Sequence, residues 1–347
     1  MKKIIECVPN FSEGRDKQFL QAIEEAIKNV DGVHLLNLEP DADYHRAVCT
    51  FVGDEKSVVE AAYQATKVAA KMIDMTKHKG EHPRMGATDV VPFVPVQNAS
   101  VEDCIRCSRE YGRRIAEDLQ IPVYLYEEAA TEEKRRNLAS VRAGQYEGLA
   151  EKLQDESWKP DFGEARFNAK SGATITGVRK FLIAYNVNLN SEDLALAKEI
   201  AFTLRESGRL KKDAEGNKIF DENGKALRIK GKLKNVKGLG VALPDHGITQ
   251  VSMNLTDYTI TGMEKVYLSC VEEAEKLGIS VTGSEAVGLV PEDALLQAGK
   301  YFAEASGLDT ENSDELLKLA IEKLGLSDLH EFDVNEKVIE KIIANME

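Results

Sequence analysis

Apolar and polar residues alternate along the first hundred positions with two different periods. Short apolar runs are typical of strands, whereas apolar residues three or four positions apart are typical of helices. By these patterns, strands are predicted at residues 3–9, 33–38, 45–52 and 88–96, and helices at residues 16–30 and 57–75. The predicted order of elements is therefore βαββαβ.

The same order returns in the second half of the chain. Strands are predicted at residues 179–189, 236–243, 249–255 and 279–289, and helices at residues 191–207, with Ser191 as N-cap, and 262–277. The two halves share this order but little sequence, so we expect a duplicated α/β (α+β) fold of two ferredoxin-like βαββαβ subdomains. Each sheet needs a cover for the face that its helices leave open. We therefore expect the subdomains to pack sheet to sheet, with a cleft between them.

Other segments connect and extend these two units. The pattern predicts a helix at residues 101–119, a strand at 121–126, a charged helical stretch at 131–153 and a glycine-containing loop at 159–177. Residues 208–235 are polar and charged, and an Asn-Gly pair at 223–224 predicts a hairpin there. We place an N-terminal subdomain at residues 1–178, a C-terminal subdomain at 179–305 and a helical C-terminal extension at 306–347.

Composition argues against several classes of protein. The formal net charge is −14, which is unfavourable for nonspecific binding to nucleic acid or to anionic membranes. No apolar run approaches the roughly 20 residues that cross a bilayer. Five scattered cysteines indicate free thiols in a reducing cytoplasm, and the CxxC of Cys104 and Cys107 lacks the second pair that a zinc site needs. We therefore expect a cytoplasmic protein that binds no metal, nucleic acid or membrane.

The segment KGEHPRMGATDVVPFVPVQ, residues 79–97, combines residues that a core strand does not need. Pro83 keeps His82 out of the α conformation, and the glycines on either side allow close approach of the backbone. The imidazole of His82 titrates near neutral pH, which suits proton transfer. Arg84 and the nearby lysines would hold a carboxylate. The alternative is an ordinary surface turn with solvated charges.

Two further segments could hold an anionic ligand. Residues 161–181 are punctuated by glycines and carry four basic side chains, but they match neither a P-loop nor a dinucleotide-binding motif. Residues 6–15, ECVPNFSEGR, place Asn10, Ser12 and Glu13 at the carboxyl end of a predicted strand, where ligands often bind. The alternatives are an inter-domain linker for the first segment and simple helix capping for the second.

With these segments in view, the chain resembles the glutamate formimidoyltransferases, the family that also forms the formiminotransferase half of formiminotransferase-cyclodeaminase. The resemblance runs from end to end through seven blocks in order. These blocks are ECVPNFSEGR at 6–15, TFVGD at 50–54, HKGEHPRMGATDVVPF at 78–93, IPVYLYEEA at 121–129, SGATITGVRKFLIAYNVNL at 171–189, QVSMNLTDY at 250–258 and GSEAVGLVP at 283–291.

The resemblance implies transfer of the formimino group from N-formimino-L-glutamate to N5 of tetrahydrofolate, a step of histidine degradation that needs no metal. It implies a folate tunnel between two subdomains packed sheet to sheet, a homodimer, and a separate cyclodeaminase as a possible partner. His82 falls on the catalytic histidine of the family. The folate-binding segment of the family falls on Gly163, Glu164, Ala165, Arg166, Phe167, Asn168, Ala169, Lys170, Ser171 and Gly172.

Glutamate and folate carry carboxylates, for which Arg46, Arg84, Arg179 and Lys180 are the candidate partners. The chain departs from the family pattern at His45, at Arg166 and residues 168–171, and in the longer excursion at residues 208–235. Two alternatives remain open. The first is formyl transfer from N-formylglutamate, or another one-carbon step at N5. The second is a folate-binding protein without catalysis, against which the intact histidine block argues.

Overall fold

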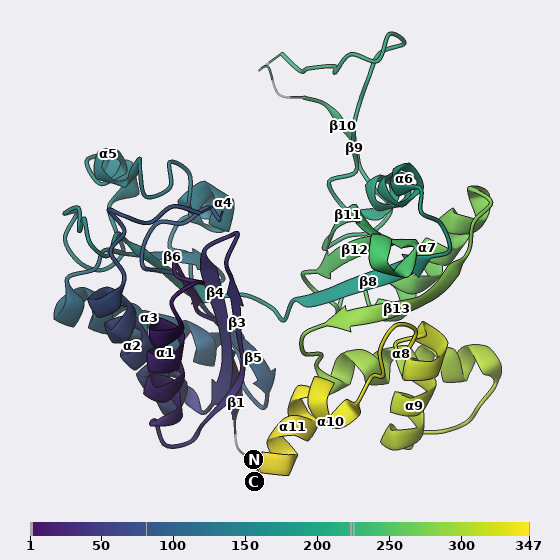
Figure 1. Cartoon of the computed structure of the whole chain (residues 1–347), viewed down its shortest axis with the longest axis horizontal. Helices are drawn as coiled ribbons and strands as arrows, with labels where there is room; N and C mark the ends of the chain where they lie inside the picture. The colour runs from purple at the N-terminus through teal and green to yellow at the C-terminus, as the bar shows by residue number, and fades with distance from the viewer. Residues whose placement is uncertain (1–2, 81, 223, 225, 347) are drawn as a thin grey trace. The chain divides into compact units, whose positions relative to one another are not determined.

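The computed structural model describes residues 3–80, 82–222, 224 and 226–346 (Figure 1). The chain divides into two compact units, the first ending at Lys180 and the second beginning at Phe181. Each unit has its own sheet and its own helices. No helix within the described residues is long and apolar enough to cross a membrane.

The first unit contains a mixed seven-stranded sheet. Its antiparallel part has the strand order β3-β4-(β1 and β2)-β5, which is the order of a ferredoxin-like βαββαβ unit. Strand β7 pairs in parallel with β5, and β6 pairs in parallel with β7. The strands are β1 (Ile4–Cys7), β2 (Asn10–Phe11), β3 (Val33–Asp41), β4 (Arg46–Gly53), β5 (Thr88–Gln97), β6 (Val123–Glu127) and β7 (Thr174–Val178).

Three helices cover one face of this sheet (Figure 1). They are α1 (Lys17–Lys28), α2 (Glu55–Met72) and α3 (Val101–Leu119). Side-chain oxygens of Asp16, Asp54 and Ser100 cap their first turns, which defines where each helix begins. Cys104 and Cys107 lie on the buried face of α3 and belong to the core under this sheet.

The opposite face of the sheet carries a second, smaller core. Met85, Tyr124, Ile175 and Val141 are among its buried members. It lies under residues 131–158, which include the charged helical stretch predicted at residues 131–153. Only short helices form there, namely η1 (Glu133–Arg135), α4 (Leu138–Val141), α5 (Leu149–Lys152) and η2 (Glu156–Trp158).

The second unit contains a four-stranded antiparallel sheet with the order β11-β12-β8-β13, again that of a βαββαβ unit. The predicted fold class is thus confirmed for each unit, while their packing sheet to sheet stays a prediction. Asp193, and not Ser191, caps α6. The elements are β8 (Ile183–Leu189), α6 (Leu194–Leu204), β11 (Val236–Leu243), β12 (Ile248–Leu255), α7 (Met263–Lys276) and β13 (Val281–Val287), with η3 (Pro244–His246) between β11 and β12.

Two additions complete the second unit. A hairpin with β9 (Arg209–Leu210) and β10 (Arg228–Ile229) leaves it between α6 and β11, as predicted, although Asn223 of the expected turn lies outside the described residues. The C-terminal part is helical, also as predicted, with α9 packed on α8. Its helices are α8 (Glu292–Ser306), α9 (Ser313–Leu324), α10 (Val334–Lys337) and α11 (Ile339–Met346).

Candidate active site

The three segments with candidate chemistry meet in the first unit. Ser12 donates from its backbone N–H to Ala87 O (2.9 Å) and from Oγ to Gly86 O (2.7 Å). On the other side, Ala87 N–H donates to Ser171 O (2.9 Å) and Ala173 N–H to Met85 O (3.1 Å). Residues 6–15, 79–97 and 161–181 are therefore neighbours in space, although about 160 positions separate the first of them from the last in the sequence.

His82 lies on the bend that leads into β5, and it is half-buried. The backbone N–H of His82 donates to the carbonyl oxygen of Tyr44 (3.4 Å), in the turn between β3 and β4. Gly80 makes this approach possible, because a Cβ there would lie 2.5 Å from Tyr44 O. The interpretation of Gly80 as a close-approach position is thus confirmed.

Positive charge surrounds the imidazole of His82. Burial, followed by the guanidinium groups of Arg46, Arg142 and Arg84, lowers the pKa of His82 to about 3. This pKa differs from the near-neutral value expected from sequence, because burial disfavours the charged ring and three arginines oppose a further cation at the same place. At neutral pH the ring is therefore an uncharged base.

Two other histidines support this bend. The rings of His45 and His78 stack with centroids 4.4 Å apart. His78 accepts from Arg84 Nε at Nδ1 (3.1 Å), so its Nε2–H donates to His45 O (3.0 Å). Burial lowers the pKa of His78, in agreement with this neutral tautomer. Both ring nitrogens of His45 face oxygens, of Lys79 (2.8 Å) and Glu13 (3.0 Å).

The guanidinium of Arg84 already has a carboxylate partner. Its terminal nitrogens donate to both oxygens of Glu147, at 2.9 and 2.7 Å, and its Nε donates to His78. The Arg84 side chain is 7% exposed, and it lowers the pKa of Glu147. Arg84 thus connects the histidine segment to residues 142–147 and contributes charge to the site from a fixed position.

Arg142 is a site residue that the sequence reasoning missed. It forms an ion pair with Asp89, whose carboxylate also accepts from Met85 N–H at 2.8 Å. Burial raises the pKa of Asp89, and the charge of Arg142 opposes that shift. No local pattern distinguished Arg142 from the other charges of residues 131–153, because its role depends on contacts with a distant strand.

Unlike Arg84 and Arg142, which pair with Glu147 and Asp89, Arg46 forms no ion pair with any residue that the structure describes. Its Nε is buried and has no hydrogen-bond partner among the described residues, and the same is true of Arg142 Nε. The guanidinium of Arg46 lies 5.8 Å from the ring centroid of Tyr44. Arg179 and Lys180 follow β7, and Arg179 donates to the carbonyl oxygen of Lys180 at 3.1 Å. A carboxylate ligand would find its clearest unpaired donor at Arg46.

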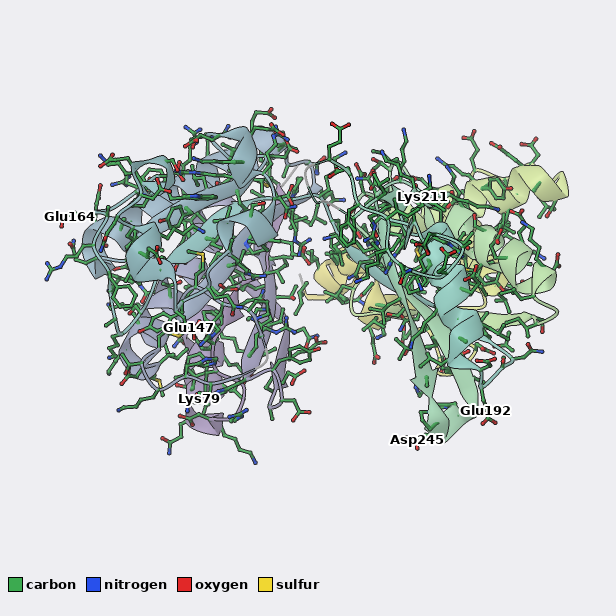
Figure 2. The ribbon with its side chains drawn as sticks, turned by 90° about the horizontal axis from the view of Figure 1, so that it is seen from above. Lys79, Glu147, Glu164, Glu192, Lys211 and Asp245 are labelled. Carbon is green, nitrogen blue, oxygen red and sulfur yellow. The ribbon has the colours of Figure 1, made fainter. Side chains whose placement is uncertain are left out.

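The segment Gly163–Gly172 forms a mostly exposed loop next to the histidine segment. Tyr146 anchors it, since its OH donates to Ala169 O (2.5 Å) and its ring lies 5.5 Å from that of Phe167. The ammonium of Lys170 donates to Lys71 O, at the end of α2 (2.8 Å). Figure 2 shows Glu164 at the outer edge of the first unit, where residues 164 and 166–169 line a shallow groove with Gln120.

An uncharged imidazole among arginines, on an α/β scaffold, is suited to proton transfer on anionic substrates. The chain belongs to the formiminotransferase family. The family model described as "Formiminotransferase domain, N-terminal subdomain" matches residues 4–179, and the one described as "Formiminotransferase domain" matches residues 184–344. The family expected from the seven sequence blocks is thus confirmed.

Relatives of two lengths are similar to the chain. It is 46% identical over 343 residues to a formimidoyltransferase-cyclodeaminase of Dictyostelium discoideum, covering 99% of this chain and 61% of that protein. It is 45% identical over 311 residues to a glutamate formimidoyltransferase of Thermoplasma acidophilum, covering 89% and 95%. It is 40% identical over 309 residues to a glutamate formimidoyltransferase of Streptococcus pyogenes serotype M1, covering 89% of this chain and 96% of that protein. The chain thus spans about three fifths of the cyclodeaminase-containing relative.

Replacing Gly172 by alanine should destabilise the first unit. Gly172 has φ +67°, and a Cβ would lie 2.2 Å from Met85 O, where the two site segments touch. We expect a loss of more than about 1 kcal/mol in the free energy of unfolding, measured by urea denaturation. Gly216→Ala is the matched control, because φ is +87° there and nothing lies within 4 Å of its Cβ. Equal losses in both variants would contradict the close approach at Gly172.

The stability of the protein should depend on the neutral state of His82. Its pKa is about 3 in the folded chain and 6.5 ordinarily, so between these values the unfolded chain binds the proton first. The free energy of unfolding should therefore fall as the pH falls from about 7 to 4, and His82→Gln should remove part of that slope. The exposed His330→Gln is the control. A slope unchanged in His82→Gln would show that the ring is not held neutral.

Proposed function

We propose that this protein is a glutamate formimidoyltransferase, which transfers the formimino group of N-formimino-L-glutamate to N5 of tetrahydrofolate. The products are 5-formimidoyltetrahydrofolate and L-glutamate. The observation that carries the proposal is the uncharged, half-buried His82 among three arginines, in a chain that belongs to the formiminotransferase family. Similarity to single-function relatives over nearly their whole length supports the same activity.

The reaction starts with attack of N5 on the formimino carbon. A C–N5 bond forms, and the π electrons of the C=N bond move to the imino nitrogen. The tetrahedral intermediate carries one proton too many at N5, and the nitrogen of glutamate needs one in order to leave. His82 accepts the proton from N5 and returns it to the departing amine, so that C=N forms again as the C–N bond to glutamate breaks.

The electrostatics of the site suit both halves of this proton transfer. An uncharged ring can accept a proton at once, and the surrounding guanidinium groups make the protonated ring a strong acid toward the leaving amine. Carboxylates of a bound substrate would offset the charges of Arg46, Arg142 and Arg84. We therefore expect the pKa of His82 to rise when an anionic substrate binds.

Arg46 is the first candidate for a substrate carboxylate, because its buried Nε has no hydrogen-bond partner and, unlike Arg142, its guanidinium forms no ion pair with a described residue. Arg84 is engaged by Glu147, so we propose that it acts mainly through its charge and its support of His78. Arg179 and Lys180 remain further candidates. Arg142 is engaged by Asp89, as Arg84 is by Glu147, so we propose that it also acts mainly through its charge.

Tetrahydrofolate would be the co-substrate, with its pteridine or its tail held by the loop Gly163–Gly172. The exposed backbone of residues 163–170 and the side chain of Phe167 support this assignment, because they offer hydrogen-bonding groups and a ring surface. We further propose that the two units pack sheet to sheet around the folate, that the protein is a cytoplasmic homodimer, and that a separate cyclodeaminase uses its product. The proposed steps need no metal.

The donor can be identified directly. Purified protein is incubated with tetrahydrofolate and either N-formimino-L-glutamate or N-formylglutamate, and the folate absorbance spectrum is followed. We expect product only, or far faster, with the formimino donor. Product formation with the formyl donor alone would replace the proposed reaction by formyl transfer. Binding of folate without product from either donor would indicate a folate-binding protein.

His82→Ala should lower kcat by roughly 10²- to 10⁴-fold, the usual effect of losing a general acid–base group. The dissociation constant for tetrahydrofolate, measured by fluorescence titration, should change little, because the ring acts on a proton. For the wild type, kcat should fall at acid pH, and this fall should lie at higher pH than that of kcat/KM. The pH profile of kcat reports the substrate complex, in which bound carboxylates raise the pKa of His82. His330→Ala, in an exposed loop, is the control. A folded, fully active His82→Ala protein would refute the mechanism.

A further inference from the structure

Lys152, the last residue of α5, has an unusual set of partners for a lysine. Its side chain is half-buried, and its ammonium forms no ion pair with any residue that the structure describes. Instead it donates to two backbone carbonyl oxygens, those of Val141 and of Ala143 (3.0 Å). Its Nζ also lies 4.1 Å from the ring centroid of Trp158, within the range of a cation–π contact. Removing a charge from water is costly, so these contacts keep the ammonium in one place.

The two carbonyl oxygens belong to the residues on either side of Arg142. They lie at the end of α4, where the last carbonyls of so short a helix have no partner inside the helix. No backbone N–H of a described residue donates to either of them. The ammonium of Lys152 therefore holds the backbone at residues 141–143.

Arg142 transmits this contact to the candidate site. Its guanidinium pairs with the buried carboxylate of Asp89, and its charge helps to lower the pKa of His82. The position of this charge depends on the backbone from which the side chain starts. Lys152 thus acts on the surroundings of His82 from the far side of residues 141–143.

The residues that follow Arg142 contact both site segments. Tyr146 donates from its backbone N–H to Arg84 O (2.8 Å) and from its OH to Ala169 O (2.5 Å), in the loop at residues 163–172. The carboxylate of Glu147 accepts from the Arg84 guanidinium at 2.9 and 2.7 Å. A displacement of the backbone at residues 141–143 would therefore disturb the histidine segment and the loop together.

We propose that Lys152 is a positioning residue of the candidate active site, which holds residues 141–143 so that Arg142 and the following turn keep their places beside His82 and the loop. Lys152 touches none of the reacting groups and acts through Arg142. This inference rests on the proposed function and adds a residue to its machinery. The alternative is a cap for α4 that affects stability and leaves the reaction unchanged.

The charges around Lys152 define how it should titrate. Burial, followed by the charge of Arg135, lowers the pKa of Lys152 to about 8. Arg135 is itself paired with Asp161. The other titratable groups near the same indole are Lys134, with Nζ 5.0 Å from the ring centroid and a salt bridge to Glu132, and Tyr124, whose OH donates to Trp158 O.

The ionisation of Lys152 can be followed without any activity measurement. Trp158 is the only tryptophan of the chain, so its fluorescence reports the charge that lies against its ring. In the wild type we expect a fluorescence change with its midpoint near pH 8. The change should be lost in Lys152→Met and kept in Lys134→Met. A wild type without this transition would contradict the contact, whether or not the protein transfers formimino groups.

Steady-state kinetics tests the positioning role. Lys152→Met keeps the length of the side chain but removes its charge and its donors, so kcat/KM should fall roughly 10- to 100-fold, as expected when catalytic groups are displaced. Lys152→Arg, which keeps the charge and the donors, should recover most of this loss. Lys134→Met is the matched control, because Lys134 lies against the same ring but donates to Ser157 O, and it should leave kcat/KM unchanged.

A double-mutant cycle separates positioning from a purely structural effect. If Lys152 acts through Arg142, the variant Lys152→Met/Arg142→Met should be no more impaired than Arg142→Met alone, because the second change removes what the first one acts on. Circular dichroism and thermal melting establish that each variant is folded, and Lys152→Gln replaces Lys152→Met in the cycle if the latter is not.

Two results would overturn the inference. One is a Lys152→Met protein as active as the wild type, and the other is a double variant in which the two losses multiply, as independent effects do. Both differ from a failure of the proposed function, in which the wild type itself transfers no formimino group to tetrahydrofolate.

Discussion

The close approach of two backbone segments at Gly86 and Gly172 is the contact on which the candidate site depends. An added Cβ at either position would lie within 2.4 Å of a carbonyl oxygen of the other segment. Through this approach the histidine bend and the glycine-rich loop become neighbours, and Ser12 connects the first strand to the same point. The side chains of the two segments come close to one another only because glycine, which has no side chain, occupies the point of contact in both.

On that backbone, a chain of polar contacts fixes the surroundings of His82. Glu13 faces His45, His45 stacks on His78, His78 accepts from Arg84, and Arg84 ends on Glu147. Each member has a partner that fixes its orientation, as positioned catalytic groups require. The result is a local positive field in a strongly acidic protein, and at this short range the neighbouring charges outweigh the distant ones.

The sequence predicted the order of elements because strand and helix periods are strong in buried, regular segments. It missed β7, because Thr174–Val178 follows a glycine-rich loop and carries a glycine of its own. It extended the helix at residues 131–153 too far, since Gly144 and Gly148 break it. His82 could be selected from its Pro and Gly neighbours, whereas the role of Arg142 and the depressed pKa of His82 arise from contacts that no local pattern contains.

The two units show how one architecture acquires different roles. In the first, the connection from α2 to β5 covers residues 73–87 and carries His82, while the connection from α1 to β3 covers only residues 29–32. In the second unit the proportions are reversed. The connection from α7 to β13 covers residues 277–280, and that from α6 to β11 covers residues 205–235 and forms the projecting hairpin. Loops tolerate such growth because they add little to the cost of folding the elements that they join. The shared βαββαβ order therefore supplies two similar frames, and the one long connection in each frame carries the histidine bend in the first unit and the projecting hairpin in the second.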